Sequence, residues 1–293
     1  MLIHLNSNSQ KPNRVLVIGG TGFLGRCVVA KLIDNSVEVL SLGSKEINLL
    51  ESSSVDVLTR LLKSTDTVIF SSAITPDKGR DIDAFMKNIL MMKHFCKAII
   101  SIKIAHLIYF SSDAVYGQKQ SFLSEESPLA PQDLYGAMHL SRELMLLELS
   151  DISVAILRIT AAYGAEDTHT SYGPNRFLSS ALKNQTIDLF GCGEEFRDHI
   201  YGDDVAVITD LCIHMRSCGL LNVATGKSYR FKKVAEIIAD QCNKPVKIHQ
   251  NARSSPITHK HFDITNLLKA FPSLYLTGLE EGLKLSQIHK LKN

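Results

Sequence analysis

The sequence has no run of basic residues and almost no net charge. Its 32 Lys and Arg residues balance 30 Asp and Glu residues, for a formal charge of +2. Without a basic stripe, nothing in the sequence would follow a phosphate backbone or an acidic membrane surface. No apolar stretch approaches the roughly 18 residues that cross a bilayer. We therefore expect no nucleic-acid partner and no membrane partner.

Cysteine is scarce and shows no functional pattern. The six cysteines include no CxxC pair and have no spacing with histidine that suits zinc. We expect isolated reduced thiols, no metal site and a cytoplasmic location. Segment 1–13 lacks the continuous apolar core of a signal peptide, in agreement with that location.

The rest of the composition is that of a globular α/β protein. Short β-branched runs alternate with longer helical patterns, which predicts a Rossmann-type doubly wound parallel sheet. Strands are expected at 14–18, 37–42, 67–70, 106–110 and 154–158. Helices are expected at 23–33, 82–102, 231–242 and 263–271.

The pattern loosens after about residue 160, where turn clusters become frequent. We therefore expect an NAD(P)-binding Rossmann domain in residues 1–160, whose core also takes strands near 195–225. Residues 161–293 would form a smaller, discontinuous C-terminal domain that binds substrate.

The first expected strand ends in glycines and leads into a helix. Gly19, Gly22 and Gly25 have GxxGxxG spacing, in which one glycine turns the chain, one lets the backbone approach a pyrophosphate, and one lets helix pack on strand. The helix N-terminus, with Phe23 and Leu24, would face the phosphates with free N–H groups. The segment predicts a dinucleotide site, and a plain structural turn is the alternative.

The end of the second expected strand bears on the choice of dinucleotide. A carboxylate at this point would bind the diol of an adenosine ribose, but the strand ends in Ser, Gly and Lys. Ser44 and Lys45 are able to accept a 2′-phosphate instead, although an exposed loop lysine is usually only solvated. We expect NAD or NADP, with a lean to NADP.

Two further segments carry a resemblance to a known family. Residues 111–117 (SSDAVYG) follow the strand at 106–110, and residues 135–139 (YGAMH) open a helix. Together with the glycine motif, they resemble the extended short-chain dehydrogenase/reductases, the NAD-dependent epimerase/dehydratase family of nucleotide-sugar enzymes. The resemblance runs nearly end to end. It includes Ala73 in a loop that contacts the cofactor, Asn88 in the next helix, and the later runs 190–193, 197–198, 203–206, 221–226 and 279–283.

The resemblance implies Ser112 and Tyr135 as the catalytic pair. Removing a hydroxyl proton requires a tyrosine, with a pKa of about 10, to be stabilised as phenolate. The family places a lysine four residues after this tyrosine, on the same helix face, but here the residue is His139. A neutral imidazole can bond a ribose hydroxyl, yet it is fully charged only below a pKa of about 6.5. We expect His139 to bond the ribose and Tyr135 to act mainly as an acid; a decayed active site is the alternative.

The residues after Ser112 bear on the reaction. Family dehydratases carry an acidic pair there, whereas this chain has Asp113 and Ala114, so dehydration is disfavoured. Asp113 is a candidate for substrate contact, and capping of the following turn is its commoner role.

Two arginines are candidates for substrate binding. The resemblance implies that Arg197 donates to substrate phosphate, with a structural pair to Asp198 or Asp204 as the alternative. Arg176, like His169, lies in the polar loop 167–176 that would cover the substrate.

We therefore expect an NAD(P)-dependent epimerase or keto-reductase that acts on a carbinol or keto carbon of a nucleotide-activated sugar. A non-catalytic NAD(P)-binding regulator or redox sensor is the alternative, because the lysine is missing and fold alone does not settle function. We also consider that the protein forms a homodimer.

Overall fold

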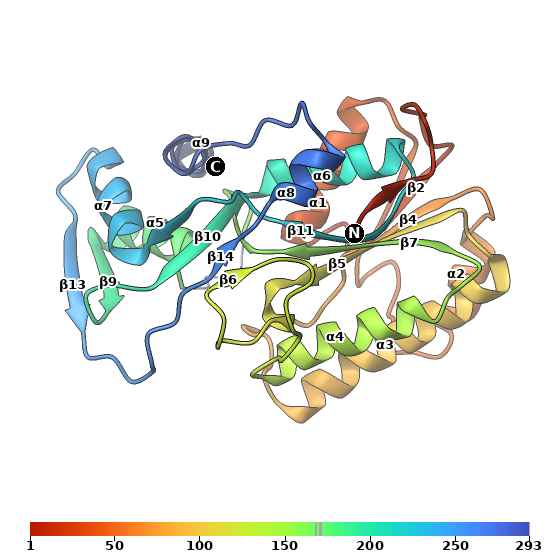
Figure 1. Cartoon of the computed structure of the whole chain (residues 1–293), viewed down its shortest axis with the longest axis horizontal. Helices are drawn as coiled ribbons and strands as arrows, with labels where there is room; N and C mark the ends of the chain where they lie inside the picture. The colour runs from red at the N-terminus through yellow and green to blue at the C-terminus, as the bar shows by residue number, and fades with distance from the viewer. Residues whose placement is uncertain (168, 170–171, 293) are drawn as a thin grey trace.

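A seven-stranded sheet forms the centre of the molecule in the computed structural model, which describes residues 1–167, 169 and 172–292 (Figure 1). The strand order is β1-β11-β7-β5-β4-β2-β3, and every neighbouring pair is parallel except β1 with β11. The strands are β1 (Ile3–His4), β2 (Val15–Ile18), β3 (Val39–Leu42), β4 (Thr67–Phe70), β5 (His106–Ser112), β7 (Ser153–Ile159) and β11 (Ser217–Val223). The expected doubly wound α/β sheet is confirmed.

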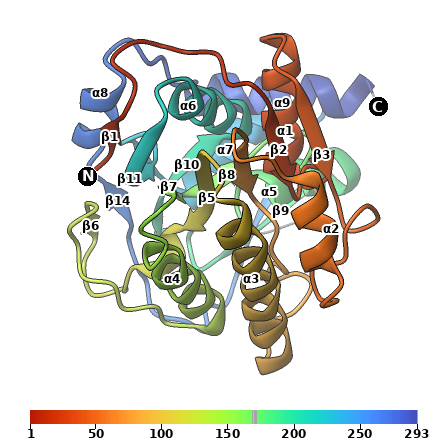
Figure 2. The same cartoon turned by 90° about the vertical axis from the view of Figure 1, so that its right-hand side faces the viewer.

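Helices cover both faces of this sheet (Figure 2). One face carries α1 (Phe23–Asp34), α6 (Gly202–His214) and α8 (Thr265–Ala270). The other carries α2 (Ser54–Leu61), α3 (Ile82–Ile102) and α4 (Leu134–Leu147). In β2, Val15 and Val17 pack toward the first set and Leu16 and Ile18 toward the second. Burial on both sides explains why the strands are almost wholly apolar.

The remaining elements pack beside the large sheet, at the left of Figure 1. β10 (Phe196–Tyr201) lies between β8 (Ala161–Tyr163) and β12 (Ser228–Arg230), and β9 (Thr186–Phe190) pairs with β13 (Lys247–Asn251). Their core is shared with α5 (Pro174–Asn184), α7 (Phe231–Gln241) and α9 (Leu279–Lys292). A short pair, β6 (Phe122–Leu123) with β14 (His261–Phe262), connects this part to the loops after β5.

The strands near 195–225 divide between two sheets, although both contribute to the expected core: Ile200 of β10 and Leu221 of β11 pack in one cluster with Val15 of the large sheet. β11 pairs with β7 in that sheet, but β10 pairs with β8 and β12 in the smaller one. Sequence pattern does not distinguish the two because both strands are short and buried. After residue 160 the chain thus returns to the large sheet through α6, β11 and α8.

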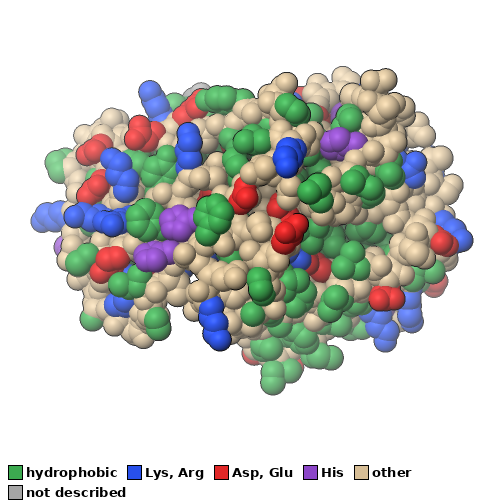
Figure 3. Space-filling model, in the orientation of Figure 1, with side chains coloured by type: hydrophobic (Ala, Val, Ile, Leu, Met, Phe, Trp, Pro, Cys, Tyr) green, Lys and Arg blue, Asp and Glu red, His purple; other side chains and the backbone are tan. Residues whose placement is uncertain are grey.

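The surface and the cysteines agree with the composition. On the face shown in Figure 3, Lys and Arg side chains are interspersed with Asp and Glu. All six cysteines are free. Among residues 1–167, 169 and 172–292, no cluster suits a metal ion and no helix is long and apolar enough to cross a membrane.

Candidate active site

A cavity of about 620 Å³ opens at the carboxyl ends of β2, β3, β4 and β5. Ligands of open α/β sheets bind at this edge, where the strand order changes direction. The lining comes from the loops that follow these strands, from α4, and from the segment after β7. Of the expected site residues, the lining includes Gly19, Gly22, Phe23, Leu24, Gly25, Ser44, Ala73, Ser112, Asp113, Tyr135 and His139.

The glycine turn forms one wall of the cavity. Gly19 has φ +89°, and a Cβ there would lie 2.8 Å from the Ser71 Oγ and the Ser72 nitrogen. A Cβ at Gly25 would overlap the Gly19 carbonyl, so α1 packs directly on the turn. Helix α1 begins without a side-chain cap, which leaves its first N–H groups available to an anion. This wall can hold a pyrophosphate.

A carboxylate lies at the end of β3, although the sequence analysis found none closing that strand. Glu46 Oε2 accepts a hydrogen bond of 2.8 Å from the Gly43 nitrogen, beside the cavity-lining Ser44. Lys45 is exposed and does not line the cavity. The signal for Glu46 was its position just after the strand, because a short turn can bring a side chain back onto the strand end.

Ser112 and Tyr135 reach the cavity from neighbouring elements. Ser112 ends β5, and Tyr135 lies in the first turn of α4. That turn is capped by Asp133, whose side chain accepts 2.8 Å from the Gly136 nitrogen. A Cβ at Gly136 would overlap the carbonyl of Ala114, so α4 starts in contact with the turn that follows Ser112. The absence of a side chain at Gly136 thus allows the approach.

The phenol of Tyr135 is in its acid form. Burial raises the pKa of Tyr135 to about 12, and the nearby carboxylate of Asp113 contributes to the rise. At neutral pH the side chain therefore carries its proton and is able to donate it. This state agrees with the expectation that Tyr135 acts mainly as an acid.

His139 is a neutral, buried imidazole. Its pKa is lowered to about 3, first by burial and then by the positive charge of Arg142. Its ring packs edge-on against that of Tyr135, with centroids 4.7 Å apart. Nδ1 lies 2.8 Å from the hydroxyl of Tyr109, whereas Nε2 is buried without a hydrogen-bond partner in the part of the chain that the structure describes.

Helix α4 is anchored one turn beyond His139 by a buried ion pair. Glu143 accepts from the Ser111 Oγ at 2.5 Å and pairs with Arg158 of β7 at 2.7 Å. Arg158 also donates to the Tyr116 hydroxyl at 3.0 Å. These bonds fix the rotation of α4, and with it the side of the helix that faces the cavity.

Asn88 of α3 fixes the cavity loop after β4. Its Oδ1 accepts 2.9 Å from the Ile74 nitrogen and its Nδ2 donates 3.0 Å to the Ile74 oxygen. Arg142 of α4 donates to the Asn88 oxygen and to the Ser72 oxygen. The loop that lines the cavity is thus tied to both neighbouring helices.

Asp113 is engaged by a lysine that the sequence analysis did not single out. Lys260 Nζ lies 3.0 Å from Asp113 Oδ2 and donates 2.9 Å to its carbonyl oxygen. The turn is capped by Ser112 instead, whose Oγ accepts 3.2 Å from the Ala114 nitrogen. Lys260 lies 147 positions further along the chain, and no local pattern links the two residues.

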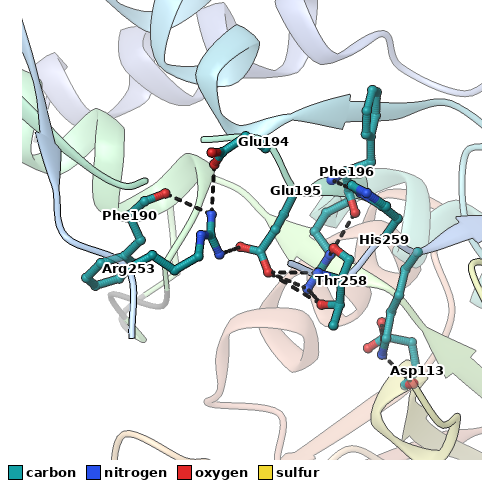
Figure 4. A network of polar contacts seen from close by, with 10 residues as sticks. Asp113, Phe190, Glu194, Glu195, Phe196, Arg253, Thr258 and His259 are labelled. Carbon is teal, nitrogen blue, oxygen red and sulfur yellow. Dashed lines mark hydrogen bonds and ion pairs between the residues drawn. The ribbon is translucent and has the colours of Figure 1, made fainter. Parts of the chain in front are cut away.

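Arg197 lies outside the cavity lining. Its partners Glu195 and Thr258 belong to the polar network that Figure 4 shows from close by. Its guanidinium donates to Thr258 O at 2.7 Å and Oγ1 at 2.8 Å, and lies 3.6 Å from Glu195. Arg253 binds the same Glu195 at 3.1 Å. The alternative partners, Asp198 and Asp204, accept instead from Thr225 and Thr277, respectively.

The expected substrate loop lines the cavity through Asp167, His169, Tyr172, Pro174 and Asn175, but not through Arg176. Arg176 is exposed, lies outside the cavity lining, and places its guanidinium 6.0 Å from the Tyr172 ring centre. His169 lines the cavity and lies 3.0 Å from Asp77 Oδ1, across the opening. Positions 168, 170 and 171 of this loop lie outside the described residues.

His199 is a cavity residue without a sequence signal. It is buried on β10 opposite Ala161, and both of its ring nitrogens lack a hydrogen-bond partner within the described residues. Its pKa is lowered to about 3, chiefly by burial. Only the pairing of β8 with β10 places this side chain at the cavity.

The fold is shared with solved structures. The chain is similar to the UDP-glucose 4-epimerase of Thermus thermophilus in complex with NAD, with a TM-score of 0.84 at 21% identity. The match covers 95% of this chain and 99% of the other.

Two curated relatives are similar over most of their length. A putative UDP-glucose 4-epimerase of Methanocaldococcus jannaschii is 28% identical, over 85% of this chain and 90% of its own. The dTDP-4-dehydro-6-deoxyglucose reductase of Escherichia coli is 24% identical, over 83% and 88%. Residues 15–224 match the NAD dependent epimerase/dehydratase family, which covers well over half of the chain. With the glycine turn, Ser112 and Tyr135 meeting in one cavity, the chain belongs to the NAD dependent epimerase/dehydratase family.

Proposed function

We propose that the protein uses NAD(P) to epimerise or reduce a carbinol or keto carbon of a nucleotide-activated sugar. One observation carries the proposal: Ser112 and Tyr135 share a single cavity with an uncapped helix N-terminus at the carboxyl edge of the sheet. Family membership supports it, as do the activities of the relatives, a putative sugar-nucleotide epimerase and a sugar-nucleotide reductase.

The side chains have distinct roles in this chemistry. In reduction, a hydride from the dinucleotide adds to the keto carbon while Tyr135 gives its proton to the oxygen. The raised pKa of Tyr135, about 12, keeps that proton available at neutral pH. The Ser112 hydroxyl hydrogen-bonds the same oxygen. Epimerisation requires the reverse transfer first and then return of the hydride to the other face of the carbon.

Dehydration is not the reaction that these residues favour. Expelling water from the sugar needs an acid beside the catalytic pair, and position 114 is an alanine. The neighbouring carboxylate, Asp113, is held by Lys260. We therefore expect no 4-keto-6-deoxy product from any nucleoside-diphosphate hexose, and detection of one would contradict this part of the proposal.

The cofactor preference depends on Glu46. The lean to NADP rested on Ser44 and Lys45. Neither Lys45 nor Glu46 lines the cavity, but the Glu46 carboxylate is held at its edge by a 2.8 Å bond from the nitrogen of Gly43, which does line it. A carboxylate at this position accepts from ribose hydroxyls and repels a 2′-phosphate. We propose that Glu46 outweighs Lys45 and favours NAD.

Arg197 remains our candidate for the substrate phosphates. Its partners are neutral oxygens of Thr258 and one carboxylate, Glu195, that it shares with Arg253. Arg253 also pairs with Glu194 at 3.0 Å, so two carboxylates face the two guanidiniums, and a diphosphate would take the fork of Arg197 in place of the distant Glu195. Arg197→Ala should weaken nucleotide-sugar binding by about 1.5–3 kcal/mol and leave dinucleotide affinity unchanged. An equal loss of both would mean that Arg197 is structural.

The test is turnover of nucleotide sugars. Purified protein is incubated with NAD or NADP, and in the reductive direction with NADH or NADPH, against a panel of nucleoside-diphosphate hexoses and their 4-keto forms. NMR then identifies a changed configuration or a reduced carbonyl. Mass spectrometry of retained ligands narrows the panel.

A dinucleotide-binding regulator is the second candidate, because His139 stands where the family's lysine is expected. Such a protein would bind the dinucleotide and leave every sugar unchanged. The same panel therefore separates the two functions.

A further inference from the structure

Helix α4 carries a buried positive charge, Arg142, that has no role in the reaction proposed above. Arg142 is 0% exposed and donates to backbone oxygens of Ser72 and Asn88 and to the Asn88 Oδ1. Within the described residues it has no carboxylate in contact. Its neighbour in sequence, Glu143, neutralises Arg158 instead, at 2.7 Å. The charge of Arg142 is thus met only by neutral groups, the backbone and amide oxygens and the Phe70 ring 5.4 Å away, and it acts on its surroundings.

Tyr109 lies between this cation and His139. Its side chain is fully buried and its hydroxyl is 2.8 Å from the His139 Nδ1. Tyr109 and Arg142 both lie against the Phe70 ring, 6.3 Å and 5.4 Å from its centre, and the guanidinium opposes the rise in the Tyr109 pKa that burial causes. A hydroxyl beside a cation turns its lone pairs toward that cation and its hydrogen away from it.

The orientation of this hydroxyl determines the tautomer of the imidazole. If Nδ1 donated to Tyr109, the phenol hydrogen would point toward Arg142 and would have no acceptor among the residues that the structure describes. An unmade buried hydrogen bond of this kind is costly. If Tyr109 donates to Nδ1, both groups are satisfied. The proton of neutral His139 then resides on Nε2.

Nε2 is the nitrogen of His139 that is left to bond a ligand in the cavity. It is buried, has no partner in the described part of the chain, and belongs to a residue that lines the cavity beside Tyr135. A buried N–H without a partner is rare in folded proteins unless a ligand or a water supplies the acceptor. A hydroxyl of a ligand bound in this cavity would supply that acceptor.

We propose that Tyr109 and Arg142 hold His139 as a neutral imidazole with its proton on Nε2, and that this N–H donates to a ribose hydroxyl of the dinucleotide. Arg142 supplies the fixed positive charge near Tyr135. Two roles that one lysine would combine, donor and cation, are thereby divided between two residues. The identity of the ligand rests on the proposed function, but the tautomer does not.

The charges around Tyr135 agree with this division. Asp113, Asp133 and Asp77 raise the pKa of Tyr135, whereas Arg142 is the cation that lowers it. Asp113 is itself paired with Lys260. Tyr109 and Arg142 are positioning residues in this scheme, because neither lines the cavity.

The tautomer is measured directly in the ligand-free protein. Two-bond 1H–15N spectra of 15N-histidine-labelled protein distinguish Nε2–H, Nδ1–H and imidazolium, and the signal that disappears in His139→Gln assigns the residue. We expect Nε2–H above about pH 5, since the pKa of His139 is about 3. A protonated Nδ1 or an imidazolium at neutral pH would overturn the proposal.

Dinucleotide binding tests the donor. Tyr109→Phe removes only the hydroxyl and should weaken NAD(H) binding about three- to tenfold through His139, as expected for one hydrogen bond. The matched control is Tyr163→Phe, which removes another buried hydroxyl outside the cavity and should leave binding unchanged. Unchanged NAD(H) affinity in a folded Tyr109→Phe protein would contradict the proposal.

A second pair of variants decides the matter if Tyr109→Phe does not fold. His139→Gln keeps an N–H donor near the Nε2 position, whereas His139→Leu removes it. We expect the Leu variant to bind NAD(H) at least threefold more weakly than the Gln variant, and equal affinities would overturn the donor role. Failure of the proposed function looks different: every sugar stays unchanged while the tautomer and the NAD(H) affinities follow these expectations.

Discussion

The two walls of the cavity are built from different chemical groups. The wall from Gly19 to Gly25 offers backbone N–H groups, and its described lining contains no charged side chain. The wall from α4 offers side chains, with Tyr135 and His139 at the surface and Arg142 behind them. The comparison teaches that backbone geometry allows little substitution, whereas the roles of side chains can be moved to a neighbour.

The physical reason is that one wall is made by contacts between backbones and the other by long side chains. The glycine turn works because backbone meets backbone, and a single Cβ at Gly25 would overlap the Gly19 carbonyl. Side chains on α4 reach the cavity through three or more bonds, so another residue one turn away can supply the same charge. This difference is consistent with a chain that retains the glycine spacing but has His139 in place of a lysine.

The largest effect is expected from a substitution in the α4 wall. Tyr135→Phe removes the proton donor and should lower turnover by about 10²–10⁴-fold, as is usual for loss of a general acid. Dinucleotide affinity should stay within about threefold, because the other wall is untouched. Steady-state kinetics and calorimetry measure the two quantities. Turnover equal to that of the parent would remove Tyr135 from the reaction and favour the regulator function.

The next largest effect is expected from a substitution in the glycine wall. Gly25→Ala should destabilise the protein by about 1–3 kcal/mol, because the new Cβ displaces the Gly19 turn, and it should abolish dinucleotide binding. In an open helix the same change would stabilise by up to about 1 kcal/mol, so the sign itself is informative. Urea unfolding gives the free energy of unfolding.

Gly278→Ala is the matched control for this prediction. Nothing lies within 4 Å of a Cβ built at Gly278, so stability and dinucleotide binding should both be retained. A tolerated alanine at Gly25 would show that the turn has more room than the contacts indicate.

A smaller effect is expected from removing the charge of Arg142, next to the α4 wall. Arg142→Gln removes the cation that opposes the rise in the Tyr135 pKa that burial causes, so that pKa should rise further. Oxidation of a carbinol uses the phenolate, so its pH–rate profile should move to higher pH by about one unit. The measurement is kcat/KM for oxidation across pH.

Arg142→Lys separates charge from geometry in this prediction. It keeps the charge but loses the planar fork that binds Ser72 and Asn88. If both Arg142 variants move the profile equally, the bonds to the loop matter and the charge does not.

The smallest effect is expected from a substitution of Glu46, at the edge of the glycine wall. Glu46→Gln removes a negative charge at the end of β3 and should shift relative affinity toward NADP(H) by about three- to tenfold. Titration with NAD(H) and NADP(H) measures this ratio. If the parent already binds NADP(H) more than about tenfold tighter, Glu46 does not control the preference.

Much of the fold and part of the site could be predicted from sequence. The helix expected at 82–102 spans Ile82–Ile102, and the strand expected at 67–70 spans Thr67–Phe70. Boundaries were less accurate where a turn intervenes: the strand expected to begin at Val37 begins at Val39, after Ser36 with φ +55°. The sequence did not indicate that β10 pairs in the smaller sheet, because sheet membership depends on long-range pairing.

The sequence by itself determined the alternating strands and helices, the glycine turn, and the positions of Ser112, Tyr135 and His139, because each is encoded by residues close together in the chain. Only the tertiary structure decided their surroundings. Lys260 reaches Asp113 across 147 positions, Tyr109 reaches His139 across 30, and Arg197 lies with Thr258 outside the cavity lining. Burial, charge and hydrogen-bond direction belong to such contacts, and they set whether a side chain is an acid, a donor or a cation.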